Sequence, residues 1–527
     1  MAGSRWVKGG LWGETAAFLA LFFDNVGSLV FLSTLLVFTF NYPAEIVLTR
    51  MIPGTAVWVF LGDLVYTFLA LRLRRQTGRT DVTAMPLGID TPSTIGLALA
   101  VLGPTYVATG DAEITWHVGM GTLFLIGIVK IVASFGGEAV RRVVPTAGLL
   151  GPLAGIGLLL LSFLPLLEIF ASPIVGLAAL GLSFSVLLGK VRLPGRLPGV
   201  LLAVLAGTAI HFILGYGGLL PEFQPPRWEV SPCLPMPSVA FLGNIHRSLP
   251  YLPLAVPFGI MTIVGGINNT HSARLAGDDY RTRDILLTEA VTSLVAPFFG
   301  GVAQTTPYIG HPAYKRMGAT HWYTAMTALM IGLASLAGLL SLLCVLIPQA
   351  ALAPIFLFIG FEIVRQAFAE APPGHAEAVS ISMLPAVAVC IMIVLNQFLG
   401  ALPPGRWEWS AHLKVVLTSL TTLANGFIVT GVLWGSMTAF LIDGRTGKAA
   451  LGAFLGALMT PFGLIHSVRP TGEVYLPWEV EGSAHLCLAT GYLILAAVWL
   501  AAGRGRKDEG QGPSLRARLS KGRRKSS

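Results

Sequence analysis

Long apolar runs constrain this chain more than any other feature. Sixteen of them follow one another along the 527 residues, separated by short polar stretches. A helix needs about 20 predominantly apolar residues to cross a bilayer. Charged residues make up 12% of the chain, about half the usual share in soluble domains. The sequence therefore predicts an all-α polytopic membrane protein with spans near 14–40, 54–73, 86–102, 118–136, 147–167, 171–189, 197–215, 251–272, 284–300, 302–313, 320–345, 347–365, 378–400, 413–442, 447–466 and 484–503.

The placement of Lys and Arg predicts the orientation of these spans. With a cytoplasmic N-terminus, nineteen fall on the cytoplasmic side and six outside, before the tail is counted, as the positive-inside rule requires. The tail, residues 504–527, adds nine more and is expected to lie against anionic headgroups. The net charge of +9 therefore does not indicate a nucleic-acid partner. We expect both termini in the cytoplasm and a location in the bacterial inner membrane. Lys130 lies near the inner end of a span, where we expect it to snorkel.

The span order predicts an inverted repeat. The first seven spans run from inside to outside and the next seven from outside to inside. Two short, broken spans, 86–102 and 302–313, fall third and tenth, which are equivalent places in the two halves. We therefore predict a 7+7 inverted-repeat transporter fold with two extra C-terminal spans. The joining segment, 216–250, is expected to be either an ordered lid or surface-lying segment, or a plain linker.

The first broken span contains Pro86, Gly88 and Pro92, which do not belong to one smooth helix. Because the residue before a proline avoids the α region, residues 85–90 are expected to be extended. A half-helix should start near Pro92 with Thr91 as its cap, and Ser93 in its first turn.

The second broken span repeats this plan, with extended backbone around 302–306 and Pro307 starting a short helix. The half-helix N-termini of the two spans would then meet near the bilayer midplane, where their amides suit carbonyl or anionic groups of a ligand. The alternative is two Pro-kinked helices packed in a bundle. The candidate side chains here are Gln304, Thr305, Thr306, Tyr308 and His311.

The eighth span places Asn268, Asn269, Thr270 and His271 in a row. Polar side chains at membrane depth usually face the bundle interior. Amides that both donate and accept suit a planar heterocycle, and the alternative role is hydrogen bonding between helices.

Five ionisable residues within spans are functional candidates by default. Asp24 lies mid-span and ranks first as a proton or cation site. His311 is the second candidate for that role, and the alternative is that it is a packed, satisfied histidine. Asp63 is expected to make a structural hydrogen bond. Glu289 and Glu362 lie near inner ends and are expected at interfaces; the fifth residue is Asp90.

In plan, residues 14–440 resemble the nucleobase–cation symporters of the xanthine/uracil permease group. The stretches 292–301 and 304–310 are similar to that family's ninth and tenth helices. The resemblance implies a core domain, 1–140 and 251–345, and a gate domain, 141–215 and 346–442. The remaining predicted segments are the extracytoplasmic loop 216–250, additional spans 443–503, and the basic tail 504–527.

The family motif in the tenth helix reads Gln, Glu or Pro, then Asn, any residue, Gly, four residues, Thr, and a basic residue or Gly. Pro307, Gly310 and Arg316 match this motif, whereas Tyr308 replaces the Asn and Lys315 replaces the Thr. Family members that bind nucleobases generally carry an acidic residue in the eighth helix and often another in the tenth. This chain has neutral amides there and resembles a divergent member.

These observations predict a permease for a nucleobase or similar small planar solute, working by alternating access with proton or cation coupling. It needs no cofactor and is expected to form a homodimer by analogy. An anion carrier or channel-like protein of the same fold is the alternative, because sulfate and bicarbonate carriers resemble this plan too. A membrane enzyme would need a nucleophile–base pair or a metal cluster at membrane depth, and the sequence indicates neither. In a receptor or scaffold that transports nothing, the two broken helices would have no evident role. The predicted substrate contacts are Asn268, Asn269, Thr270, Gln304, Thr305, Thr306, Tyr308, Thr91 and Ser93, and the predicted coupling residues are Asp24 and His311.

Overall fold

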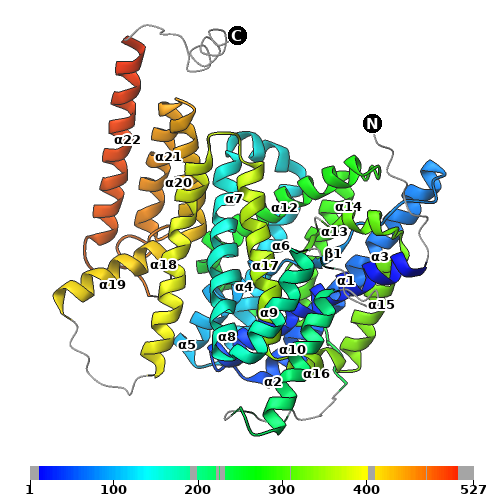
Figure 1. Cartoon of the computed structure of the whole chain (residues 1–527). Helices are drawn as coiled ribbons and strands as arrows, with labels where there is room; N and C mark the ends of the chain where they lie inside the picture. Colours follow the sequence, from blue (N-terminus) through cyan, green and yellow to red (C-terminus); the bar gives the residue numbers. More distant parts are fainter. Residues whose placement is uncertain are drawn as a thin grey trace, which may run out of the picture.

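The computed structural model describes residues 11–508 with short gaps, and it is almost entirely helical (Figure 1). By length and hydropathy, eight described helices could each cross a membrane, or ten if each of two bent helix pairs is one span. The gaps are residues 190, 192–198, 221, 222, 224, 226–231, 309, 402–409 and 471. The predicted basic tail lies outside the described residues from 509 onward.

The first half of the chain follows the seven predicted spans closely. Four π-helical segments lie along its helices, and the third span breaks as predicted into a strand and a helix. Its elements are α1 (Leu11–Thr34, continued by the π segment Leu35–Thr39), α2 (Ala44–Ile46), α3 (Ile52–Thr77), β1 (Leu87–Ile89), α4 (Thr91–Leu97), α5 (Gly103–Thr109), α6 (Ala112–Val143), α7 (Thr146–Gly155), α8 (Leu164–Ala171), α9 (Pro173–Leu187) and α10 (Gly199–Tyr216).

The second half repeats this order, with a strand again in its third span. Two of its spans are sharply bent, by 86° between α15 and α16 and by 78° between α19 and α20. Its elements are α11 (Ala240–Gly243), α12 (Leu252–Leu275), α13 (Thr282–Val295), β2 (Thr305–Pro307), α14 (His311–Met317), α15 (Trp322–Leu336), α16 (Leu339–Leu346), α17 (Gln349–Glu370), α18 (Ala376–Ala401), α19 (Ala411–Ala424), α20 (Phe427–Ile442), α21 (Thr446–Met459) and α22 (Ala484–Asp508).

The helices pack in two groups. In the core group, α6 contacts α12 and α13, and α15 contacts α1 and α3. In the gate group, α7 contacts α17, α18 and α20, and α17 contacts α8 and α9. The groups touch through α1 against α17, α12 against α20, and α4 against the π segment Ile156–Phe163. The predicted domain boundaries remain a prediction, and "core group" and "gate group" here name only this packing.

The described part of the joining segment is ordered and packs on the core group. Phe241 of α11 is fully buried, and its ring centroid lies 5.2 Å from that of Phe298. The backbone amide of Ser238 donates to the carbonyl of Phe298 at 2.7 Å. This segment therefore packs over the end of the ninth span.

The C-terminal addition braces the bend between α19 and α20. Figure 1 shows α21 and α22 side by side next to α20. At the bend, Asn425 Nδ2 donates to the carbonyls of Ser467 and Arg469, both at 2.8 Å. His466 Nε2 lies 2.8 Å from the Tyr492 hydroxyl of α22. The loop after α21 thus supplies the polar partners that the broken backbone of the bend needs. The helix α21 is 14 residues long, shorter than the predicted span 447–466.

We expect Asn425→Ala to destabilise this brace, because two carbonyls lose their donor at once. Each lost partner should cost about 1–3 kcal/mol if its carbonyl stays buried. Thermal unfolding of the purified protein would measure the loss, with Asn396→Ala at an exposed position of α18 as the matched control. Equal melting temperatures for the two variants would show that the bend does not depend on this loop.

Candidate functional site

The site is built on a two-stranded antiparallel sheet at membrane depth. Strand β1 pairs with β2 so that Gly88 lies opposite Thr306. The pairing extends at each end: the Asp90 amide donates to the Gln304 carbonyl at 2.9 Å, and the Tyr308 amide donates to the Pro86 carbonyl at 2.9 Å. The two predicted breaks are therefore present and their extended segments pair, and the predicted broken-helix fold is confirmed. The meeting of the half-helix N-termini near the bilayer midplane stays a prediction.

Side chains satisfy the outer edges of this sheet. On the β1 side, the Leu87 amide donates to Asp63 Oδ1 at 3.1 Å, and the Ile89 amide donates to Asn25 Oδ1 at 2.9 Å. On the β2 side, Lys130 Nζ donates to the Thr305 carbonyl at 2.7 Å. All three of these side chains are buried. The structural hydrogen bond expected of Asp63 is thus confirmed, whereas Asn25 was missed.

The half-helix α4 begins one residue earlier than predicted. Asp90, rather than Thr91, is its N-cap, and its Oδ2 accepts a hydrogen bond from the Ser93 amide at 3.1 Å. Asp is a better cap than Thr because its carboxylate also complements the helix dipole. Thr91 instead bonds to Ser28 of α1, with 2.9 Å between the hydroxyl oxygens.

The half-helix α14 begins later than predicted. Pro307 does not start it but ends strand β2. Proline has no backbone N–H to donate, but this position uses its carbonyl, so a proline is tolerated here. Asn269 Nδ2 donates to that carbonyl at 2.6 Å. The helix starts at His311 with Gly310 before it.

Tyr308 fills the space beside the strand pair. Its ring lies against Gly88, where a Cβ atom would meet the ring at 2.2 Å. Its hydroxyl donates to the Ile89 carbonyl at 3.0 Å and is also a hydrogen-bond partner of the Asp24 carboxylate. Gly88 is therefore required for close approach, and Tyr308 connects the two broken spans to α1.

Six polar residues of the two broken spans, α1 and α12 are half-buried rather than buried. We name this set of residues the accessible wall. The six are Asp24, Asp90, Asn268, Asn269, Thr306 and Tyr308. Of the predicted contacts, the structure thus places Asn268, Asn269, Thr306 and Tyr308 on that wall together with Asp24.

The remaining predicted contacts are buried and bonded within the protein. Thr270 donates to the Gly266 carbonyl of its own helix at 2.7 Å, and the Thr305 hydroxyl lies 2.7 Å from that of Thr292. Gln304 Nε2 donates to Asp90 Oδ2 at 3.3 Å. These side chains shape the strand pair from behind, and Ser93 does so from within α4.

Asn268 reaches from the core group to the gate group. Its Nδ2 donates to Glu370 Oε2 at 3.1 Å, at the end of α17. A contact of this kind joins the two packing groups next to the accessible wall. It breaks if the groups move apart.

His311 points away from the accessible wall into a buried ionic cluster. Its Nε2 lies 3.1 Å from the Thr83 carbonyl and 3.2 Å from Asp278 Oδ2. Asp278 also pairs with Lys315 at 2.6 Å and with Arg79 at 3.3 Å. The cluster ties the loop after α12 to α14 and to the segment before β1. The role of His311 in coupling stays a prediction; the ring is buried and packed, with hydrogen-bond partners at Nε2.

Charge–charge contacts in this cluster control the acidity of Asp278, which lies in the loop after α12. Burial by itself would raise its pKa, but hydrogen bonds from His311 and Lys315 outweigh that effect and the pKa is lowered. The ionised form is therefore the stable one in the folded protein.

Lys130 does not snorkel. It is fully buried, and its Nζ lies 2.9 Å from Oε1 of Glu289, which is also fully buried. Snorkelling fails because α6 packs against α12 and α13 along its length, so no path leads its side chain to the headgroups. Glu289 is correspondingly an internal ion-pair partner rather than an interface residue. Glu362 is exposed and pairs with Arg365 on the same helix.

The chemistry available at the accessible wall is binding rather than bond breaking. Within the described residues, no three His, Cys, Asp or Glu side chains are placed to hold a metal ion. Asp24 and Asp90 take part in none of the ion pairs between described residues. The wall therefore offers two carboxylates, two amides, a hydroxyl and an aromatic ring.

Solved structures share this architecture. The transmembrane domain of BicA, a bicarbonate transporter of a cyanobacterium, matches with a TM-score of 0.50 and 18% identity, covering 75% of this chain and 97% of that chain. The murine anion transporter Slc26a9 in an inward-facing state matches with a TM-score of 0.51 and 14% identity, covering 75% of this chain and 69% of that chain. A further SLC26A9 structure matches with a TM-score of 0.50 and 14% identity, covering 74% of this chain and 65% of that chain.

This is the fold of membrane transporters built from a 7+7 inverted repeat with broken helices. At these identities the likeness concerns the fold alone. Comparisons with protein families and with curated proteins find no match.

We expect Gly88→Ala to disturb the site, because the added methyl group would overlap the Tyr308 ring. Overpacking of this kind costs about 1–3 kcal/mol, and here it would push Tyr308 away from Ile89 and Asp24. Thermal unfolding and ligand binding would measure the effect. Gly181→Ala, where a Cβ atom meets nothing within 4 Å, is the matched control. A variant as stable as the control would contradict the contact.

We expect Asp278→Asn to lower stability by about 3–5 kcal/mol at neutral pH, because the buried Lys315 ammonium loses its charged partner. The folded pKa of Asp278 lies below its unfolded value, near 3.9, so its contribution is present above that value and is lost as the pH falls. The gap between variant and wild type should therefore stay nearly constant down to about pH 4 and shrink as the pH falls below that value. Thermal unfolding at about pH 7, 4 and 3 checks this, with the neighbouring exposed Asp279→Asn as control; a gap that widens with acid would refute it.

Proposed function

We propose that this protein is a secondary active transporter for a small, neutral, planar solute of the nucleobase type, coupled to protons. One observation carries the proposal. The half-buried carboxylate of Asp24 lies beside the Tyr308 hydroxyl, where the two broken spans meet, and it has no cationic partner among the described residues.

Alternating access follows from the way the two packing groups meet. In transporters with inverted repeats, broken helices hold the substrate at the midplane and one bundle rocks against the other. Here the strand pair belongs to the core group, and α17 and α20 of the gate group face it through α1 and α12. The Asn268–Glu370 hydrogen bond would open and close with that movement.

The accessible wall suits a planar solute with both donors and acceptors. Tyr308 provides an aromatic ring held in place by Gly88, and aromatic rings stack on planar heterocycles. Asn268, Asn269 and Thr306 provide amide and hydroxyl groups that both donate and accept. The strand pair would keep water away from one side of the bound solute, because the backbone groups at its outer edges already have hydrogen-bond partners in the protein.

Charge at the wall supports proton coupling. A carboxylate at membrane depth without a cation is costly, and such residues mark proton or ion pathways in transporters. Protonation of Asp24 removes that cost and leaves a hydroxyl donor beside Tyr308. Binding of a neutral solute and of a proton at adjacent groups would then link the two transport events.

Anion transport is the second candidate, favoured by the anion-transporting structural neighbours. The N-terminus of α4 would attract an anion, but the Asp90 carboxylate already accepts the Ser93 amide there. An anion would have to approach two unpaired carboxylates, which repel it unless they are protonated. The site therefore supports a neutral solute better than an anion.

The test is uptake into proteoliposomes against a panel of purines, pyrimidines, bicarbonate, sulfate and chloride, with and without an imposed pH gradient. We expect accumulation of a nucleobase driven by protons. Asp24→Asn should abolish most proton-driven accumulation, because an amide side chain cannot take up and release the coupled proton, while leaving solute exchange intact. Glu362→Gln, at an exposed surface pair, is the control.

Two results would overturn the proposal. Uptake confined to anions would favour the second candidate. Proton-driven accumulation unchanged in Asp24→Asn would remove Asp24 from the coupling step. Neither result would change the fold. The expected homodimer and the cytoplasmic position of both termini stay predictions.

A further inference from the structure

Lys130 places a positive charge next to the second broken span, where its Nζ donates to the Thr305 carbonyl. It lies on α6 within an apolar span, and no part of its side chain is exposed. Its ammonium group is held behind β2, on the side of the strand pair opposite β1. A lysine so deep in a membrane protein is costly unless every part of its charge is compensated.

The compensation comes from three oxygens of different kinds. Nζ lies 2.7 Å from the Thr305 carbonyl, 2.9 Å from Glu289 Oε1 and 3.1 Å from Ser293 Oγ. An ammonium has three N–H donors, so these contacts use all of them. A carboxylate, a hydroxyl and a carbonyl of non-helical backbone form the kind of oxygen set that binds a hard cation.

The ammonium is linked to the accessible wall through β2. Thr305, whose carbonyl it binds, follows Gln304, and Gln304 Nε2 donates to Asp90 Oδ2 at 3.3 Å. The positive charge of Lys130 also acts on Asp90 through space. A positive charge in this position therefore holds the strand in place and offsets the negative charge of the site.

We propose that the Lys130 ammonium is a built-in cation that occupies a monovalent-cation site behind β2, formed by Glu289, Ser293 and the Thr305 carbonyl. The wild-type protein consequently binds no Na⁺ or K⁺ there and needs neither for transport. Removal of the lysine side chain turns the same three oxygens into a site for Na⁺, K⁺ or a small alkylammonium ion. The part about transport rests on the proposed function, whereas the part about the site does not.

A cation site and a purely structural ion pair predict different behaviour when the lysine is removed. If the pair only fills space, Glu289 in Lys130→Ala takes up a proton and added cations make no difference. If the oxygens form a cation site, the variant gains a specific, saturable response to cations. The Glu289 carboxylate is essential to that response.

The first experiment measures thermal unfolding of purified wild type, Lys130→Ala and Lys130→Ala/Glu289→Gln. Each is titrated with NaCl, KCl or methylammonium chloride and compared with choline chloride at equal ionic strength. We expect a saturable upward shift of about 2–4 °C in Lys130→Ala alone. Recovery of folded Lys130→Ala only when one of these cations is present during purification would equally support a cation site.

Three results overturn the proposal. A saturable Na⁺ or K⁺ shift in the wild type would place a working cation site elsewhere. A folded Lys130→Ala that responds equally to choline would show that no cation site forms. A Lys130→Ala that fails to fold in every salt, while the double variant folds, would show that the carboxylate accepts no replacement cation.

Wild-type uptake gives a measurement that depends on no variant. Proton-driven accumulation in proteoliposomes should be unchanged when choline replaces all Na⁺ and K⁺. Accumulation lost on that replacement overturns the inference even if proton coupling stands. If no solute on the panel is transported, the proposed function fails, but the unfolding measurements still decide the cation site.

Discussion

The antiparallel pairing of β1 with β2 is the constraint on which the rest of the core group depends. Non-helical backbone at membrane depth is tolerated only when its polar groups find partners inside the protein. The two strands satisfy each other, and Asp63, Asn25 and Lys130 satisfy their outer edges. Three polar side chains buried in apolar helices are thus explained by one requirement. If any of them is lost, a strand edge is left unpaired in a medium without water.

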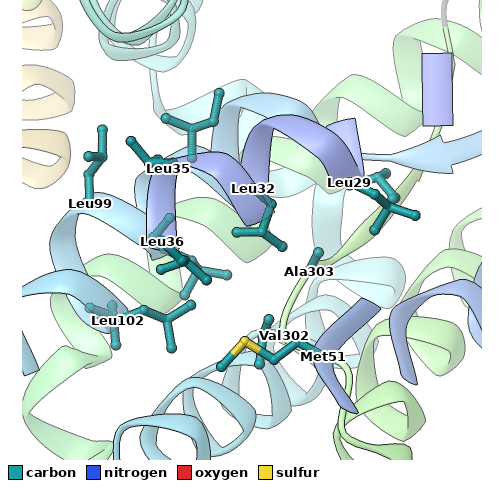
Figure 2. Close-up of a cluster of buried hydrophobic side chains, with 14 of the residues drawn as sticks. Leu29, Leu32, Leu35, Leu36, Met51, Leu99, Leu102, Val302 and Ala303 are labelled. Carbon is teal, nitrogen blue, oxygen red and sulfur yellow. The ribbon is translucent and has the colours of Figure 1, made fainter. Parts of the chain in front are cut away.

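The pairing also fixes what lies on either side of it along the chain. Toward one end, the ionic cluster around Asp278 joins the segment before β1 to α14. Toward the other, apolar side chains close the space, as Figure 2 shows for Leu32 and Leu36 of α1, Leu102 after α4, and Val302 before β2. The half-helices are therefore anchored at both ends. An element anchored in this way moves as one body with its group, which is what alternating access requires of a substrate-holding domain.

The architecture could be predicted from the sequence because the features that determine it, apolar run length and the positions of proline and glycine, are strong and local. Apolar run length predicted the long helices, although α21 is shorter than its predicted span, and proline and glycine at 86–92 and at 300–312 predicted the two breaks. The pairing of individual side chains from distant segments was not predictable. Lys130 looked like a snorkelling lysine because its partner Glu289 lies 159 positions away in sequence, as the two residue numbers show (289 − 130). The charge of each residue was visible, but their pairing was not.

The site illustrates the same limit at closer range. The sequence showed that the polar residues of the eighth and tenth spans are costly to bury in a membrane. It did not show which groups of the protein form the hydrogen bonds that offset this cost. Thr270, Thr305 and Gln304 are buried and hydrogen-bonded within the protein, whereas Asn269, Thr306 and Tyr308 are half-buried.

The two half-helix starts were also misplaced. The sequence predicted them at Pro92 and Pro307, whereas Asp90 is a stronger cap and strand β2 extends through Pro307.

The distribution of charge around the strand pair separates two functions that proline breaks alone do not distinguish. The Lys130 ammonium lies behind β2, away from the accessible wall, and is neutralised by Glu289. The wall itself carries Asp24 and Asp90, with no cation paired to either among the described residues. An anion entering there would meet negative charge from both side chains, whereas a neutral solute would not. Protonation of a carboxylate at the wall would remove negative charge from it, and the proposed coupling of transport to protons rests on that change.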